Sequence, residues 1–176
     1  LDTSSWTNIW TFKTIINSPK LCYPENSQKG VSLSDIIQWK SDLHNVYFDL
    51  QIANDINFEN ILLDTNFFDN YFDINKLDYN KKYFWRVKQG FDDEISNWSE
   101  IREFMTEIQI PELISPINNQ NEVDINTYFE WSDLSYSNSY RINIADNIEF
   151  TNLLFDDIVQ NSTSFYYNTK YNTDYF

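Results

Sequence analysis

The chain has 176 residues, of which 41% are hydrophobic and 18% aromatic, which is enough apolar surface to build packed cores. Its formal net charge of −15 repels phosphate backbones and anionic lipid surfaces, and this argues against a nucleic-acid partner. No apolar run reaches the roughly 18 residues of a membrane-spanning helix, so direct membrane insertion is not predicted.

The sequence repeats itself at a single shift of 92 residues. The matching segments, in chain order, are 4–14 with 96–106, 19–39 with 111–131, 50–64 with 142–156, and 79–84 with 171–176. A unit of this length can bury a core of its own, whereas a solenoid repeat of about 20 to 50 residues cannot. The repeat therefore predicts an array of separate domains.

Three parts follow from the repeat. Residues 1–18 are expected to be the C-terminal strand region of a preceding repeat, residues 19–110 a complete domain, and residues 111–176 an incomplete domain that lacks its last strands. The linkers IINS (15–18) and EIQI (107–110) are too short for free tumbling and predict a semi-rigid string. In the complete repeat YNKKYF (79–84) runs on into WRVKQG, whereas the equivalent segment at 171–176 is the end of the given sequence. We therefore expect the sequence to be an excerpt of a longer protein.

Several segments alternate between apolar and polar residues, as half-buried strands do. The predicted inward-facing sets are Ile37 and Trp39; Phe48, Leu50 and Ile52; Tyr83, Trp85 and Val87; and Tyr140, Ile142 and Ile144. The intervening residues, among them Gln51, Arg86 and Arg141, are expected to face solvent. Residues 58–72 have apolar pairs at helix-like spacing but contain many turn formers, and we predict two short strands with a turn there.

Turns in this sequence depend on asparagine and aspartate. Only two residues are glycine, whereas 23 are asparagine. Asn and Asp tolerate a positive φ better than other residues that carry a side chain, so we expect them to serve most such turns. Their clusters separate the predicted strands every 8 to 15 residues or so, a rhythm typical of a β-sandwich.

An ordered set of motifs runs through each repeat. It consists of an early P..L..P, a Trp that ends the second strand, YFDLQIANDINF, a Leu six residues before the Tyr of YFWRV, and then NWS and F.T. This set resembles the fibronectin type III domain, in the form found in bacterial secreted and cell-surface proteins, and it covers the whole chain. The resemblance implies tandem all-β, immunoglobulin-like sandwiches of seven strands in two sheets.

The resemblance also implies particular core residues. Trp39 and Trp131 take the place of the family's core tryptophans, and Trp85 belongs to the inward-facing set described above. Tyr83 and Tyr175 take the tyrosine-corner position, where the hydroxyl bonds to nearby backbone.

The sequence offers no catalytic or cofactor-binding site. His44 is the only histidine and is predicted to be a solvated turn residue, while Gly30 and Gly90 lie too far apart for a phosphate-binding loop. Cys22 is the only cysteine, which excludes an intrachain disulfide, and we interpret it as a small core residue in preference to a reactive thiol.

The aspartate and asparagine residues raise three further questions. The run at 64–80 carries oxygen ligands of the kind that Ca²⁺ prefers, but a solvated acidic face is favoured and no metal is predicted. Asp64 is matched by Asp156, which favours a structural role such as capping a turn. The sequons at Asn97 and Asn161 are weak signals of glycosylation.

The predicted function is a non-enzymatic structural or adhesive module array, a spacer, stalk or filament segment of a larger secreted or surface-exposed protein. The alternative is an accessory or binding region of a large secreted hydrolase whose catalytic domain lies outside this chain. The expected partners are a protein or glycan at a cell or particle surface, or neighbouring copies of the chain, in an extracellular or cell-surface location. Phe84 and Phe176 face outward and predict either a contact with a partner or packing beneath a loop.

A third, narrower hypothesis concerns the two ends of the chain. Residues 1–18 supply the equivalent of 93–110, so head-to-tail strand donation between chains could nearly complete the last repeat. The central WRVKQGFD would still be missing, which argues against this arrangement.

Overall fold

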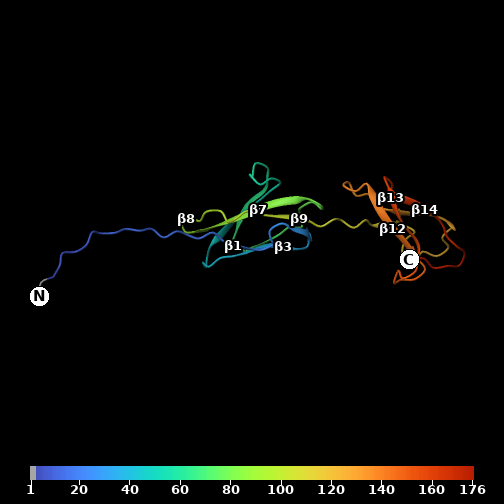
Figure 1. The fold of residues 1–176 in the computed structure, drawn as a ribbon, viewed down its shortest axis with the longest axis horizontal. Coiled ribbons are helices and arrows are strands. Elements are labelled where there is room, and N and C mark those ends of the chain that lie inside the picture. The colour runs from blue at the N-terminus through green and yellow to red at the C-terminus, as the bar shows by residue number, and fades with distance from the viewer. Residues whose placement is uncertain (1–2) are drawn as a thin grey trace. The chain divides into compact units, whose positions relative to one another are not determined.

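The computed structural model describes residues 3–176, and the regular secondary structure in that part of the chain is entirely β. The predicted all-β fold class is therefore confirmed. The chain divides into two compact units, Leu1–Ile108 and Gln109–Phe176, and the division falls inside the EIQI linker. Figure 1 shows each unit as a group of short strands joined by loops. Across residues 3–176 there is no helix long and apolar enough to cross a membrane.

The first unit, unit 1, is a two-sheet β-sandwich. Its described strands are β1 (Lys20–Tyr23), β2 (Gln28–Val31), β3 (Ile36–Lys40), β4 (Tyr47–Ala53), β5 (Ile61–Phe67), β6 (Tyr71–Asp73), β7 (Lys82–Phe91), β8 (Glu94–Ile95) and β9 (Arg102–Thr106). One sheet has the order β1-β3-β6, and the other has the order β2-β9-β7-β4-β5 with β8 paired to β7. In Figure 1 the layer that contains β7 lies above the layer that contains β1 and β3.

The core of unit 1 lies between the two sheets. Ile37 and Trp39 of β3 face Leu50 of β4 and Trp85 and Val87 of β7, and all five side chains are fully buried. Burial alternates along β7, as the sequence predicts, because successive side chains of a strand point to opposite faces. The predicted inward sets of unit 1 are confirmed. The two predicted strands within 58–72 are confirmed as β5 and β6, with a bend at 68–70 between them.

Positive φ angles fall mostly on asparagine and aspartate, as predicted. The non-glycine residues with positive φ in the described chain are Ser27, Asn45, Phe58, Asn80, Asp92, Asn119, Glu122, Phe150, Asn161 and Asn172. Three of these positions recur at the shift of 92: Ser27 with Asn119, Phe58 with Phe150, and Asn80 with Asn172. The two repeats therefore share backbone turns as well as sequence motifs.

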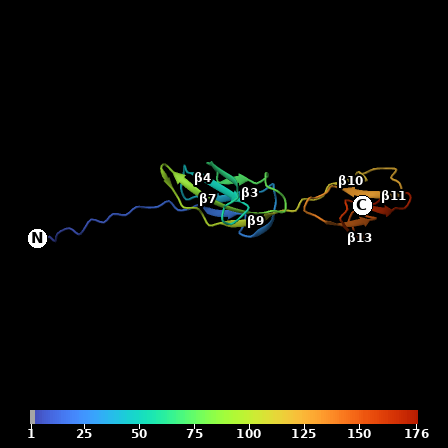
Figure 2. The same ribbon diagram turned by 90° about the horizontal axis from the view of Figure 1, so that it is seen from above.

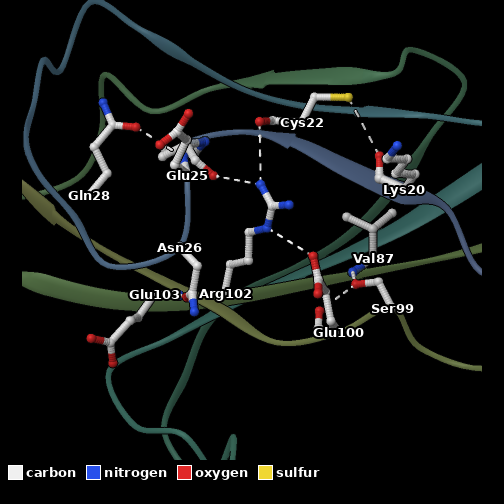
Figure 3. Close-up of polar contacts among 11 residues, drawn as sticks. Lys20, Cys22, Glu25, Asn26, Gln28, Val87, Ser99, Glu100, Arg102 and Glu103 are labelled. Atoms are coloured by element: carbon white, nitrogen blue, oxygen red, sulfur yellow. Dashed lines mark hydrogen bonds and ion pairs between the residues drawn. The ribbon is translucent and has the colours of Figure 1, made fainter.

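Arg102 ties the two sheets of unit 1 together by polar contacts. Figure 3 shows its side chain reaching from β9 toward the chain that follows β1. Its Nη1 donates to the carbonyl oxygens of Cys22 at 3.3 Å and Pro24 at 3.1 Å, and its Nε pairs with Glu100 Oε1 at 3.0 Å. These bonds hold the end of β1 against β9.

The interpretation of Cys22 as a core residue is wrong. Its side chain is only half-buried, and its thiol lies 3.6 Å from the carbonyl oxygen of Lys20. The alternation of β1 explains the error, because the neighbouring Leu21 takes the inward position and is 2% exposed.

Residues 3–18 contain no strand or helix and are drawn in blue as an extended trace in Figure 1. Their large apolar side chains are open to solvent, with Trp6 at 100%, Trp10 at 90% and Phe12 at 92% exposure. The assignment of residues 1–18 to a preceding repeat stays a prediction, and residues 1 and 2 lie outside the described residues.

The second unit, unit 2, repeats the first half of this architecture. Its described strands are β10 (Leu113–Ser115), β11 (Asn126–Trp131), β12 (Ser139–Ala145), β13 (Leu153–Gln160) and β14 (Ser164–Asn168). They form the sheets β10-β11-β14 and β12-β13. These correspond to β1-β3-β6 and β4-β5 of unit 1, and Figure 2 shows β10 and β11 above β13.

The end of unit 2 continues the pattern of unit 1 by one residue pair. Ala145 and Phe176 exchange two backbone hydrogen bonds, of 2.9 and 3.0 Å. Ala53 and Phe84, the equivalents at the shift of 92, are directly paired between β4 and β7. Phe176 therefore pairs with β12 as Phe84 pairs with β4.

Candidate functional site

The predicted core aromatics lie in the interiors of the two units. Trp39 and Trp85 are 0% exposed, Tyr83 is 2% and Trp131 is 5% exposed, while Tyr175 is half-buried. Four of these five rings present almost no surface to a ligand, and their geometry is that of packing.

Both candidate tyrosine corners have the same hydrogen bond. The hydroxyl of Tyr83 accepts from the backbone N–H of Asp78 at 2.9 Å, and the hydroxyl of Tyr175 accepts from that of Lys170 at 2.6 Å. In each pair the donor lies five residues before the tyrosine. Burial raises the pKa of Tyr83 above its ordinary value of 10.0, and this effect outweighs the hydrogen bond from Asp78, which lowers the pKa.

The stability of unit 1 is expected to fall above about pH 10. The folded-state pKa of Tyr83 is raised, so its contribution is fully present below the unfolded-state pKa and is lost as the pH rises through the folded-state pKa. Tyr23, whose pKa burial also raises, contributes in the same direction. Urea unfolding between about pH 8 and pH 11 measures this loss, and Tyr83→Phe should reduce it. An unchanged pH profile in that variant would rule out Tyr83 as a source.

A cation lies between two aromatic rings on the outer face of the larger sheet of unit 1. The guanidinium of Arg86 on β7 is 4.0 Å from the ring centre of Phe58 and 4.5 Å from that of Trp98. The ammonium of Lys88 lies 4.8 Å from the ring of Trp98. Stacking of this kind is favourable because the ring face is the negative pole of the aromatic quadrupole. We call the surface formed by Phe58, Phe84, Arg86, Trp98 and Ile101 the Arg86 face.

A polar chain runs across the same face. Arg86 donates from Nη2 and Nε to Gln51 Oε1 on β4, at 2.7 and 3.0 Å, and Gln51 Nε2 donates to Asp64 Oδ2 on β5 at 2.9 Å. Gln51 was expected to be solvent-exposed but is only 9% exposed, because it lies between these two charged side chains. Burial lowers the pKa of Arg86, and the charge of Asp64 acts in the opposite direction.

One aromatic residue of the Arg86 face, Phe84, also borders a shallow groove. Phe84 and Ile101 line it together with Ile56, which belongs to the loop between β4 and β5, and with Asn26, Ser27 and Glu103. Phe84 is half-buried, which fits the expectation of packing beneath a loop of its own domain. Ile56 and Ile101 keep 58% and 39% of their surface exposed, so the groove offers apolar surface to solvent.

The apolar residues of the Arg86 face and of this groove recur in the other repeats. Ile56, Phe58 and Phe84 are matched by Ile148, Phe150 and Phe176, and Trp98 and Ile101 are matched by Trp6 and Ile9. The positive φ of Phe58 is 58°, and that of Phe150 is 53°. A bulky residue rarely adopts this conformation, so the surrounding structure must hold both rings in place.

Comparison with known proteins gives structural neighbours only. One is a crystal structure of the FN1-FN3 domains of chicken CNTN1, with 13% sequence identity and a TM-score of 0.37. The match covers 91% of this chain and 60% of that one, so the chain spans less than two thirds of its neighbour. No family model and no curated protein matches the sequence. The fold is thus assigned from the strands and sheets described above.

Asp64 and Asp156 do not cap turns. Asp64 lies within β5, where it accepts from Gln51, and Asp156 lies within β13, where it binds Arg141 through two bonds of 2.7 Å. Their shared role is structural but acts across strands, since each carboxylate accepts from a side chain of the neighbouring strand. Hydrogen bonding by Arg141 lowers the pKa of Asp156.

The remaining candidates form no reactive cluster in residues 3–176. His44 is exposed in the bend between β3 and β4, as predicted. Within the same residues, no three His, Cys, Asp or Glu side chains come together in a way that could hold a metal ion. Asn161 is exposed in the turn between β13 and β14.

Sequence reasoning missed the Arg86 face. The alternation of the strand assigns Arg86 only to solvent, and it gives no reason to single out Phe58 or Trp98. The available signal was the recurrence of Phe58 and Trp98 at the shift of 92. The contact itself depends on which strands lie side by side, and alternation within one strand does not report that.

Replacing Arg86 by methionine is expected to lower the free energy of unfolding of unit 1 by about 1 kcal/mol. The variant loses both cation–π contacts and leaves Gln51 Oε1 without its donor. Lys82→Met is the control, because Lys82 is exposed, pairs with Glu103 at 3.0 Å and lies farther from an aromatic ring, at 5.8 Å from that of Phe84; it should cost less than about 0.5 kcal/mol. Equal costs in urea unfolding of the two variants would contradict a special role for the stacked guanidinium.

Proposed function

We propose that the chain is part of a non-enzymatic array of fibronectin type III-like modules in a larger secreted or surface-exposed protein. In this role the modules act as a spacer, stalk or filament segment. The observation that carries the proposal is the recurrence of one sandwich plan at a shift of 92 residues. The recurrence extends to the tyrosine hydrogen bonds and to the backbone turns.

Contacts of both linkers support a semi-rigid array. In the first linker Ser18 Oγ donates to the carbonyl oxygen of Asn97 at 2.8 Å, and Gln89 Nε2 donates to that of Asn17 at 2.8 Å. In the second linker the backbone N–H of Gln109 donates to the hydroxyl of Tyr136 at 2.7 Å. Asn17 and Gln109 are equivalent at the shift of 92, so each linker is held at the same position by the module that follows it. Anchoring of this kind reduces the freedom of a short linker.

An adhesive role would use the Arg86 face. It carries exposed apolar surface beside a stacked cation, and the equivalent apolar residues recur along the chain. Aromatic and arginine side chains are enriched at protein interfaces, so a protein at a cell surface is the partner that this face would suit. A repeated surface on a repeated module lets several weak contacts act together.

A binding assay on insoluble polysaccharides distinguishes a spacer or stalk segment from the accessory region of a hydrolase. The intact chain is mixed with cellulose, chitin and starch in separate co-sedimentation assays. A spacer or stalk segment should stay in the supernatant in every case. Saturable retention on one polysaccharide, lost in the variants Trp98→Ala or Phe84→Ser, would favour the hydrolase alternative and contradict the proposed role.

A further inference from the structure

We infer that the outer edge of β5 in unit 1 is a binding site for an extended, basic polypeptide segment, which adds to the larger sheet as a further strand. β5 ends the strand order β2-β9-β7-β4-β5, so one of its two edges has no neighbouring strand within residues 3–176. The inference concerns a surface other than the Arg86 face, and it does not depend on the role of the array.

β5 differs from the other edge strands of unit 1 in length and composition. β1 and β2 have four residues each and carry Lys20 and Lys29, and β6 has three residues. β5 has seven residues, ILLDTNF, with no lysine or proline among them. Short strands, lysine and proline are devices by which proteins keep other chains from pairing with an edge. The edge of β5 therefore lacks the protection that the other edges of unit 1 have.

The backbone of β5 has the geometry that an added strand needs. Its antiparallel pairing with β4 is regular from Phe67 to Leu63, and the register shifts only toward the Ile61 end. In an antiparallel pair, alternate residues exchange both of their backbone hydrogen bonds with the partner strand, and the residues between them point the other way. Those intervening N–H and C=O groups of β5 face the free edge, where an extended peptide can pair with them.

The charge around this edge favours a basic partner. Residues 54–75, which include β5 and the turns on either side of it, contain no lysine, arginine or histidine. The acidic residues of this segment are Asp55, Glu59, Asp64, Asp69 and Asp73. The equivalent segment at the shift of 92, 146–167, also has no basic residue, so the feature recurs. A second acidic copy of β5 would be repelled at this edge, whereas a basic segment would be attracted.

Asp64 lies at the centre of β5 and is exposed on its outer face. Its Oδ2 accepts from Gln51 Nε2 at 2.9 Å, and its Oδ1 has no hydrogen-bond partner within residues 3–176. A lysine or arginine placed beside Asp64 in an added strand would form a cross-strand pair of opposite charge, which is favourable.

The two faces of β5 set the side-chain pattern of the partner. Leu63 and Phe67 are half-buried and pack against the core of unit 1, so their neighbours in an added strand should be apolar. Asp64 and Asn66 are exposed on the opposite face, where basic neighbours are expected. A segment that fits therefore alternates apolar and basic residues. In this mode of recognition main-chain pairing supplies affinity, and alternate side chains supply specificity.

The experiment uses the intact chain and a synthetic peptide of about nine residues that alternates valine and lysine. The readout is hydrogen exchange of individual backbone amides during titration. The expected result is saturable binding with slower exchange in β5, while β2, the opposite edge strand that carries Lys29, stays unchanged. A peptide that alternates valine and glutamate should bind at least about tenfold more weakly. So should one that alternates proline and lysine, because proline cannot donate a backbone hydrogen bond.

A pair of variants of the chain tests the location of the site. Asn66→Lys places a positive charge on β5 and should weaken binding of the valine–lysine peptide at least about tenfold. Asn75→Lys is the matched control, because it makes the same change at an exposed residue in the turn between β6 and β7. This variant should bind the peptide as the parent chain does.

Four results would overturn the inference. The first is no slowing of exchange in β5 by the valine–lysine peptide, and the second is equal binding by either of the other two peptides. The third is equal binding by Asn66→Lys and Asn75→Lys. The fourth is self-association of the chain that protects β5 without peptide, which would assign the edge to a second copy.

Discussion

Replacing Trp39 by alanine is expected to lower the free energy of unfolding of unit 1 by about 3–5 kcal/mol. Trp39 is fully buried, and its ring lies 5.5 Å from that of Phe48 and 5.6 Å from that of Phe67, measured between centroids. Within the described residues its indole N–H has no hydrogen-bond partner, so the loss comes from packing alone. The cavity left between the two sheets cannot collapse fully, because both walls are held by strand pairing.

Trp6→Ala is the matched control for this prediction. The side chain of Trp6 is 100% exposed, so its removal should change the stability of unit 1 by less than about 0.5 kcal/mol. Urea unfolding followed by circular dichroism compares the two variants with the parent chain. Similar midpoints for Trp39→Ala and Trp6→Ala would show that Trp39 does not support the core.

Replacing Tyr83 by phenylalanine is expected to lower the free energy of unfolding of unit 1 by about 1–3 kcal/mol. The substitution keeps the buried ring but removes the oxygen that accepts from the backbone N–H of Asp78. A buried donor without an acceptor costs more than the net value of one hydrogen bond, because its hydration is lost and not replaced. The ring still packs against Phe104, at 5.9 Å between centroids.

Tyr175→Phe tests the equivalent position in unit 2. Tyr175 is half-buried, so water can replace the lost acceptor for Lys170 and the cost should be smaller than at Tyr83. The exchange rate of each donor amide gives a direct readout, since the N–H of Asp78 should exchange faster in Tyr83→Phe. An unchanged rate and an unchanged urea midpoint in that variant would contradict the tyrosine-corner interpretation.

The fold could be read from the sequence because its strongest signals are local. The alternation in 81–88 places Trp85 inward whatever strand lies beside it. Because the sequence recurs at a shift of 92 residues, most predicted strands are supported by two copies of the same pattern. Most turn positions could also be predicted from the positions of asparagine and aspartate, since a positive φ is a property of a single residue. Four positions are exceptions, Ser27, Phe58, Glu122 and Phe150, and the two aromatic ones are residues that no local rule would place there.

The candidate site could not be read in the same way because it joins distant segments. Phe58, Arg86 and Trp98 come from a loop, a strand and another loop, and they meet only when β4 and β7 are paired. The prediction for Cys22 was wrong for a related reason. Which residues of β1 point inward is set by its pairing with β3, in which Leu21 lies opposite Trp39. Register between strands is a tertiary property, and alternation along one strand leaves it open.

The most direct test of separately cored modules is hydrogen exchange on the whole chain, with and without Trp39→Ala. We expect the substitution to abolish protection in β3, β4 and β7 of unit 1 while the amides of β11 and β12 in unit 2 exchange at their parent rates. Loss of protection in both units at once would show a shared core and would contradict the account.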